Sequence, residues 1–130
     1  MPTSLEQMKD ALQRHAGDFG IQLNGELCAR MGEYYEFLLK WNDRQHLVAP
    51  CSAEEFATRH VLESLLLLPH LPQDARIADV GSGGGLPIIP CLIARGDIHA
   101  TLIESSKKKA VFLREALRVA PIARRTARRG

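Results

Sequence analysis

The stretch Asp79-Val80-Gly81-Ser82-Gly83-Gly84-Gly85 decides the fold class of this 130-residue chain. It sets four glycines into five residues, after a short apolar run and before an apolar helical pattern. Because glycine has no Cβ atom, its backbone adopts turn geometries that are closed to other residues and lets a ligand approach the peptide closely. A glycine-rich turn between a strand and a helix is typical of α/β folds that bind a nucleotide-like cofactor.

The elements around this turn are predicted from the hydrophobic pattern. Residues 76–80 form a short apolar run that predicts a buried strand. Residues 86–94 predict an apolar helix, and residues 98–103 alternate as a second strand. A strand, a helix and a strand within about 30 residues form a βαβ unit with parallel strands. Ser105 or Ser106 is expected to cap a last helix.

The chain before the glycine turn is expected to be helical, with three helices and no strand. Ser4 with Gln7 forms a capping box for the first helix, and Ser52 with Glu55 forms one for the third. The second helix is expected to begin after Asn24.

The chain divides into three parts by composition and pattern. The formal net charge is +2, yet four arginines near the carboxyl end supply four positive charges, so the preceding residues are acidic overall. The basic character therefore belongs to the tail, whose low complexity predicts disorder. The three parts are a helical cap over residues 1–70, a βαβα unit over residues 71–119 and the Ala/Arg-rich tail over residues 120–130.

Composition argues against a membrane span and a metal site. The longest apolar run, Leu65 to Leu68, is far shorter than the roughly 20 residues that a membrane-spanning helix needs. The amino terminus has no apolar block of the kind found in secretory signals, so we expect a cytoplasmic protein. Cys28, Cys51 and Cys91 lie too far apart for a zinc or disulfide framework, and we interpret them as reduced, mostly buried thiols.

The spacing of the glycines distinguishes two classes of cofactor. A dinucleotide-binding turn needs its third glycine three residues after the second, at the position where this chain has Leu86. S-adenosylmethionine instead carries a sulfonium and an ammonium group, which Asp79 at the strand end could attract. Glu104, at the end of the second strand, is placed to accept hydrogen bonds from both ribose hydroxyls. Taken alone, the glycines could form only a tight strand-to-helix turn, and the acidic residue could be only a solvated side chain. The glycine spacing together with the acid at the next strand end favours S-adenosylmethionine.

Four groups of short sequence motifs resemble those of one protein family. Over roughly residues 20–118, the chain is similar to the glucose-inhibited division protein B family, bacterial methyltransferases of 16S rRNA. The Arg-His motif and the Gly-Leu-Pro-x-x-Pro motif are more specific for this family than the glycine turn is. The four groups are Lys40-Trp41-Asn42 with Leu47, Arg59-His60-Val61-Leu62-Glu63-Ser64-Leu65, Asp79 to Pro90, and Glu104-Ser105 with Lys108-Lys109 and Phe112-Leu113.

The resemblance implies a class I methyltransferase (Rossmann-like) fold, in which a doubly wound sheet follows a helical cap. It also implies S-adenosylmethionine as cofactor, methyl transfer to guanine N7 of 16S rRNA, and small-subunit ribosomal RNA or the ribosomal subunit as partner. Guanine N7 already has a lone pair, so the transfer needs positioning and no base. Carried over by position, the cofactor-binding residues are Asp79, Gly81, Ser82, Gly83, Gly85, Leu86 and Glu104.

Asn42, Arg59 and His60 are the candidate cleft residues of the cap, because they lie in the matching words. Each also has a structural interpretation. Asn42 could cap the end of its helix, Arg59 could pair with Glu63 one turn later, and His60 could be a core histidine. Trp41 lies on the apolar stripe of its helix, and we interpret it as core rather than as a base-stacking platform.

Two features depart from the family pattern. Position 88 is Ile88 where the family usually has glycine, and a β-branched side chain there is expected to crowd the helix start. After Val119 the sequence no longer resembles the family's third strand, so we expect a sheet truncated after two strands, with both edges open. We expect such a truncated form to be marginally stable and inactive alone.

Two other functions remain open on the sequence alone. A non-catalytic RNA-binding fragment would act through the basic tail, and Lys107, Lys108 and Lys109 could add phosphate contacts. A solvated helix face explains these lysines equally well. A nicotinamide-dependent oxidoreductase is disfavoured by the glycine spacing.

Overall fold

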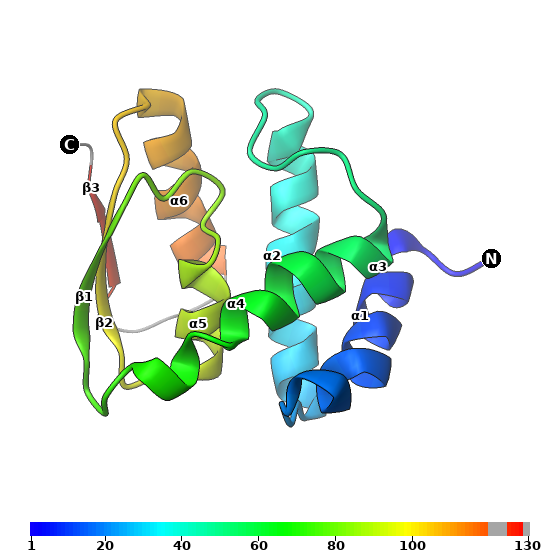
Figure 1. Ribbon diagram of the computed structural model, residues 1–130. Coiled ribbons are helices and arrows are strands. Elements are labelled where there is room, and N and C mark those ends of the chain that lie inside the picture. Colours follow the sequence, from blue (N-terminus) through cyan, green and yellow to red (C-terminus); the bar gives the residue numbers. More distant parts are fainter. Residues whose placement is uncertain (120–124, 129–130) are drawn as a thin grey trace.

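A computed structural model describes residues 1–119 and 125–128. Helices from the amino-terminal part pack beside a three-stranded parallel sheet whose strand order is β1-β2-β3 (Figure 1). All the helices labelled in Figure 1 lie on one side of this sheet, and α2 runs between the sheet layer and α1.

The amino-terminal part is helical, as predicted. A capping box forms at the start of the first helix and at the start of the third, as expected. The first box uses Thr3 and Glu6 instead of Ser4 and Gln7. Asn24 caps the second helix by accepting a hydrogen bond from the backbone N–H of Leu27. The elements are α1 Ser4–His15, η1 Ala16–Phe19, α2 Gly25–Asn42, α3 Ala53–Glu55, η2 Phe56–Leu62, α4 Glu63–Leu65 and η3 Leu68–His70.

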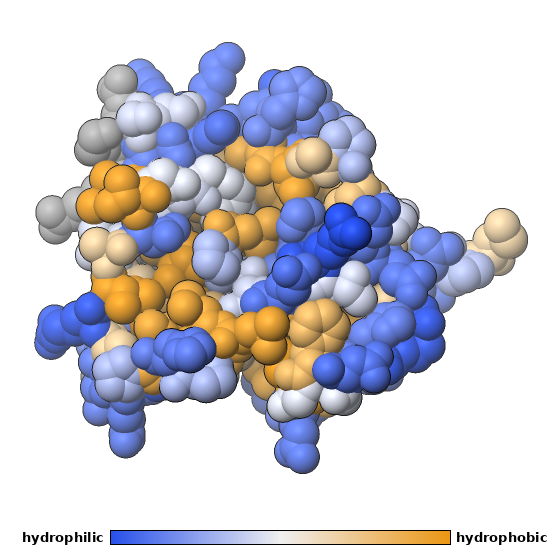
Figure 2. Space-filling model, in the orientation of Figure 1, coloured by the Kyte–Doolittle hydropathy of each residue, from blue (hydrophilic) through white to orange (hydrophobic). Residues whose placement is uncertain are grey.

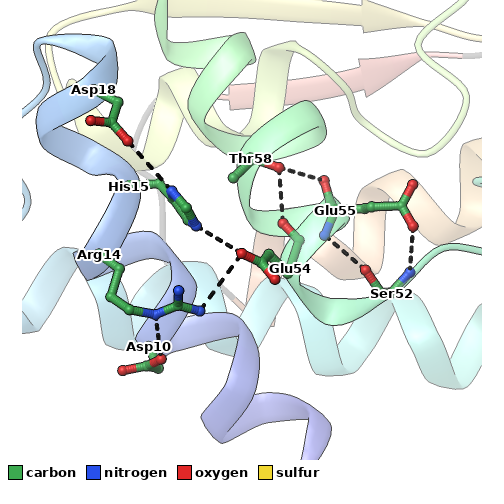
Figure 3. Close-up of polar contacts among 8 residues, drawn as sticks. All are labelled: Asp10, Arg14, His15, Asp18, Ser52, Glu54, Glu55 and Thr58. Carbon is green, nitrogen blue, oxygen red and sulfur yellow. Dashed lines mark hydrogen bonds and ion pairs between the residues drawn. The ribbon is translucent and has the colours of Figure 1, made fainter.

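The third predicted helix forms one helical segment whose middle part, η2, is a π-helix. A polar cluster fastens the start of this segment to the end of α1 (Figure 3). Glu54 lies 2.8 Å from Nε2 of His15 and 3.8 Å from the guanidinium of Arg14, which also pairs with Asp10 at 2.7 Å. These side chains are largely exposed, so the cluster orients the helices more than it stabilises them.

The predicted βαβ unit is present. It comprises β1 Arg76–Val80, α5 Ile88–Ala94 and β2 His99–Ile103, followed by α6 Lys107–Val119. The two strands pair in parallel along their whole length. The helix α5 starts two residues later than predicted, because Pro87 occupies its amino-terminal cap position. Ser106 is the residue that caps α6, since its Oγ accepts a hydrogen bond from the N–H of Lys109 at 3.4 Å.

The prediction of a sheet truncated after two strands is wrong, because a third strand, β3 Arg125–Arg128, pairs in parallel with β2. The segment 120–130 was predicted to be disordered, and four of its residues form this strand; residues 120–124 and 129–130 lie outside the described residues. An edge strand is held by backbone hydrogen bonds, which do not require an apolar alternation. The sequence Arg-Thr-Ala-Arg lacks such an alternation, so the hydrophobic pattern did not predict this strand.

The core lies between the helices and the inner face of the sheet. Its largest fully buried side chains include Tyr34, Phe56 and Phe112, which come from both parts of the chain. The outer face of β1 is bare by contrast, and Val80 is 79% exposed. Figure 2 shows apolar side chains gathered on the half of the molecule that carries the sheet and α5, whereas the half with α1 and α3 is mostly hydrophilic.

The structure also bears on the membrane, metal and cysteine features considered from the composition. No helix among residues 1–119 is long and apolar enough to cross a membrane. Within the described part of the chain, no group of three or more His, Cys, Asp or Glu side chains is arranged to hold a metal ion. Cys28 and Cys91 are buried free thiols as expected, but Cys51 is exposed.

Candidate cofactor site at the glycine turn

The glycine turn lies at the carboxyl ends of β1 and β2. The N–H of Gly81 donates a hydrogen bond of 2.7 Å to the carbonyl of Ile103, so the turn begins directly beside the end of β2. The N–H of Gly85 donates to the carbonyl of Ser82 at 2.7 Å and closes the turn before α5. Ligands of open α/β sheets bind in the crevice outside the carboxyl ends of the strands, which is where this turn stands.

Gly81 and Gly83 have the left-handed backbone that favours glycine, with φ of +76° and +52°. A Cβ atom on Gly81 would find nothing within 4 Å, and one on Gly83 would find only the Gly81 carbonyl oxygen, at 3.9 Å. The peptide at these two positions therefore borders open space. A ligand could lie directly against it.

Gly84 has a different role, because it allows the cap to approach the turn. A Cβ atom there would stand 2.8 Å from the carbonyl oxygen of Leu47, in the loop after α2. The buried hydroxyl of Tyr34 donates a hydrogen bond to the Gly84 carbonyl from the same side. Burial raises the pKa of Tyr34 far above its ordinary value, so this hydroxyl stays a donor. The sequence placed Tyr34 only on an apolar helix face and did not predict this contact.

Glu104 lies on the same side of the sheet as the glycines, as the cofactor hypothesis requires. Its Oε1 accepts a hydrogen bond of 2.8 Å from the N–H of Gly83, and its Oε2 accepts one of 2.9 Å from the N–H of Ser106. These bonds, with that of Ser106 the stronger influence, lower the pKa of the buried carboxyl group. The N–H of Ser105 also helps to lower this pKa. A carboxylate has about four acceptor positions, so it can still accept from a ligand after these backbone bonds.

The other predicted cofactor residues surround the turn. Ser82 is 2% exposed, and its hydroxyl donates to the carbonyl of Asp79 at 2.9 Å, so it braces the turn from within. Asp79 and Leu86 are half-buried. Ile88 lies in the hydrophobic core at 2% exposure, which shows that the start of α5 accommodates a β-branched side chain.

Comparison with known proteins identifies the family. Residues 27–126 match the family GidB, described as rRNA small subunit methyltransferase G. The chain belongs to the GidB family. The match runs into the arginine-rich segment that we expected to diverge, which agrees with the presence of β3 there.

Individual relatives carry the same description. The chain is 45% identical over 93 residues to "Ribosomal RNA small subunit methyltransferase G" of Nitrosomonas europaea, covering 72% of this chain and 43% of that protein. It is 38% identical over 106 residues to the protein of that name in Chromobacterium violaceum, covering 82% and 51% of the two chains. The chain thus spans about half the length of the curated relatives it matches.

Asn42, which the GidB resemblance implied to face the cleft, organises its own loop. Its Oδ1 accepts hydrogen bonds from the N–H groups of Leu47 and Val48 at 2.8 and 3.2 Å, and its Nδ2 donates to the Val48 carbonyl at 3.2 Å. The side chain therefore shapes the loop that meets Gly84. This arrangement is closer to the capping interpretation than to a free cleft residue.

Arg59 and His60, the other GidB cap residues, lie on the π-helix η2. The ring of His60 packs edge-on against Phe56, with centroids 5.5 Å apart, and Phe56 in turn packs against Tyr34 at 6.3 Å. Arg59 is exposed, and among the described residues it forms no ion pair with Glu63. The rings of Phe56 and Tyr34 thus lie between His60 and the glycine turn.

Proposed function

We propose that this chain carries the S-adenosylmethionine site of an rRNA methyltransferase with a class I (Rossmann-like) fold. One observation supports this most: Glu104 contacts the N–H of Gly83 at 2.8 Å, next to the open space beside Gly81. A carboxylate beside bare peptide can hold the ribose hydroxyls of a nucleoside while the backbone accommodates its methionine part. The assigned cofactor contacts are Asp79, Gly81, Ser82, Gly83, Gly85, Leu86 and Glu104.

The proposed reaction is methyl transfer to guanine N7 of 16S rRNA, presented as RNA or within the small ribosomal subunit, in the cytoplasm. S-adenosylmethionine supplies an electrophilic methyl group, and guanine N7 supplies a lone pair. The residues of this chain need only bind and orient, since no proton has to leave the nucleophile first. Asn42, Arg59 and His60 are the cap's candidate cleft residues, and Asn42 acts by shaping the loop that meets Gly84.

The described residues build one wall of such a site. The cap over 1–70 and the βαβα unit over 71–119 meet at the glycine turn, but β1 has a bare outer face on which Val80 is 79% exposed. An incomplete wall leaves a bound cofactor open to water, which weakens binding and disfavours the in-line geometry. We therefore infer that the 130-residue chain by itself is marginally stable and does not transfer methyl groups.

The test measures binding of S-adenosylmethionine and of NAD⁺ to the purified chain by isothermal titration calorimetry. S-adenosylmethionine should bind and NAD⁺ should not. Gly81→Ala should weaken cofactor binding by about tenfold or more, because its methyl group enters the space assigned to the ligand. Gly20→Ala is the matched control, since Gly20 has φ of +69° and equally open surroundings.

The two alanine variants carry the same backbone strain, about 1 kcal/mol each, and should lower the melting temperature equally. Only Gly81→Ala should change cofactor affinity. Equal affinity in both variants would show that the ligand does not lie against Gly81. RNA binding without any binding of S-adenosylmethionine would favour the non-catalytic RNA-binding alternative.

A further inference from the structure

A pocket of about 460 Å³ lies between the end of α2 and the first turns of α6, and none of its lining residues belongs to the glycine turn. A volume of this size is typical of small-molecule sites. The pocket is lined by Trp41, Arg44, Gln45, Lys107, Lys108 and Val111.

Trp41 supplies an aromatic wall to this pocket. One side of its indole packs against Phe37 and Phe112, with ring centroids 5.8 and 5.7 Å away. The side chain is only half-buried, and it also lines a second, adjoining pocket together with Lys40 and Arg44. The interpretation of Trp41 as core is therefore incomplete. The packed rings hold the indole rigidly, so it could stack against a flat ligand without losing side-chain freedom.

Positive charge surrounds the aromatic wall. Arg44, Lys107 and Lys108 are exposed, and among the described residues none of them pairs with a carboxylate. No acidic side chain is found among the described lining residues. Lys107 and Lys108 also form the first turn of a 13-residue helix, where the helix dipole adds further positive potential. The pocket therefore suits a ligand that is flat and apolar in one part and anionic in another.

The pocket is connected to the proposed cofactor site. Lys107 follows Ser106, whose N–H donates to Glu104. Gln45 donates to the Lys108 carbonyl at 3.5 Å, and two residues later Leu47 contacts the turn at Gly84. The pocket and the glycine turn are therefore bordered by the same two segments of the chain, the loop after α2 and the start of α6.

We propose that this pocket docks one nucleotide of single-stranded RNA next to the modified base. The base stacks on Trp41, and the neighbouring phosphates contact Arg44, Lys107 and Lys108. Stacking on an aromatic side chain combined with cationic phosphate contacts is how single strands are bound without a sequence code. The proposal rests on the proposed function for its RNA substrate, but its test does not require cofactor binding.

Trp41 is the only tryptophan of the chain, so its fluorescence reports directly on the pocket. Titration of the chain with a short unstructured oligoribonucleotide should quench this fluorescence in a saturable manner. Poly-glutamate, a polyanion without bases, should not quench it. Equal quenching by poly-glutamate would overturn the proposal and indicate a site for acidic protein segments.

The double variant Lys107→Gln/Lys108→Gln should weaken RNA binding at low salt by about tenfold, measured by fluorescence anisotropy of labelled RNA. The salt dependence should also become shallower, by about 0.7 in the log-log slope for each lost phosphate contact. The control Lys9→Gln/Arg30→Gln removes the same charge from α1 and the start of α2 and should leave affinity within about twofold. Lys109 is kept, because it acts on Glu104.

Trp41→Leu should weaken RNA binding by about tenfold, and Trp41→Phe should restore most of the affinity because it keeps a stacking surface. Thermal unfolding of each variant separates this effect from lost packing against Phe112. If RNA affinity instead depends only on the arginines at 124, 125, 128 and 129, and not on Trp41 or the two lysines, the pocket is not the docking site. Failure of S-adenosylmethionine to bind would refute the proposed function without altering these RNA measurements.

Discussion

Tyr34 is the residue through which the amino-terminal helices contact the glycine turn. Its ring is buried between the two parts of the chain, and its hydroxyl donates to the carbonyl of Gly84. A buried carbonyl without a hydrogen-bond donor destabilises the fold, because it has lost its bonds to water and gains none in return. Tyr34 therefore couples the position of the cap to the shape of the candidate cofactor site.

Tyr34→Phe should lower the free energy of unfolding by about 1–2 kcal/mol, because the Gly84 carbonyl is left without this partner. It should also weaken S-adenosylmethionine binding, since the turn loses a support. Tyr35→Phe is the control: Tyr35 lies on the same helix and is 4% exposed, but it packs on Phe56 and not on the turn. Chemical denaturation and calorimetry measure the two effects. A loss of cofactor affinity in Tyr35→Phe equal to that in Tyr34→Phe would contradict this role.

At the scale of elements, the loop after α2 fits closely against the glycine turn. Asn42 shapes this loop, and the Leu47 carbonyl oxygen comes so near to Gly84 that a Cβ atom would be 2.8 Å away. The contact joins an element of the cap to the turn after β1. The two nearest atoms to that Cβ position are backbone atoms of Leu47, so no flexible side-chain end can move away to relieve a clash.

Gly84→Ala should therefore destabilise the chain by about 1–3 kcal/mol, the usual cost of overpacking. The matched change Gly17→Ala meets nothing within 4 Å and should be neutral or slightly stabilising. Melting temperatures by circular dichroism provide the comparison. Should Gly84→Ala melt at the temperature of the unaltered chain, the close approach of the loop to the turn would be refuted.

At the scale of the whole molecule, a network around Arg95 links the cap to the sheet. The guanidinium donates to the carbonyls of Leu68, Leu71 and Pro72 and to the carboxylate of Asp97, with distances of 2.7–3.3 Å. Arg95, and next the N–H of Asp74, hold the pKa of Asp97 far below its ordinary value of 3.8. The segment that leaves the helical cap is thereby bound to the turn before β2.

Acid should destabilise the fold through these carboxylates. The folded-state pKa values of Asp97 and Glu104 are lowered, so their stabilisation is fully present above the ordinary values of 3.8 and 4.5 and is lost as the pH falls toward the lower folded values. The melting temperature should therefore fall below about pH 4.5. Asp97→Asn should lower the melting temperature at pH 7 and make it depend less on pH. The control Asp43→Asn, at an exposed position, should leave the melting temperature and its pH dependence unchanged. If the melting temperature of Asp97→Asn depends on pH as that of the unaltered chain does, the carboxylate of Asp97 is not the source of the acid sensitivity.

Local patterns in the sequence were sufficient for most elements. The glycine turn, the flanking strands, the start of α2 after Asn24 and the cap at Ser52 depend on residues close together in the chain, and all were predicted. The position of Glu104 beside the glycines followed as well, because the carboxyl ends of adjacent parallel strands meet at one edge of a sheet. The assignment of these residues to a cofactor stays a prediction.

The features that escaped prediction depend on contacts between distant segments. β3 forms because β2 offers an open edge for backbone hydrogen bonds, and its own side chains carry no strand pattern. Tyr34 and Leu47 approach Gly84 only after the cap packs against the sheet. The pocket beside Trp41 likewise requires α2 and α6 to lie next to each other. Local backbone preference is encoded residue by residue, whereas packing between distant segments is determined only when the whole chain folds.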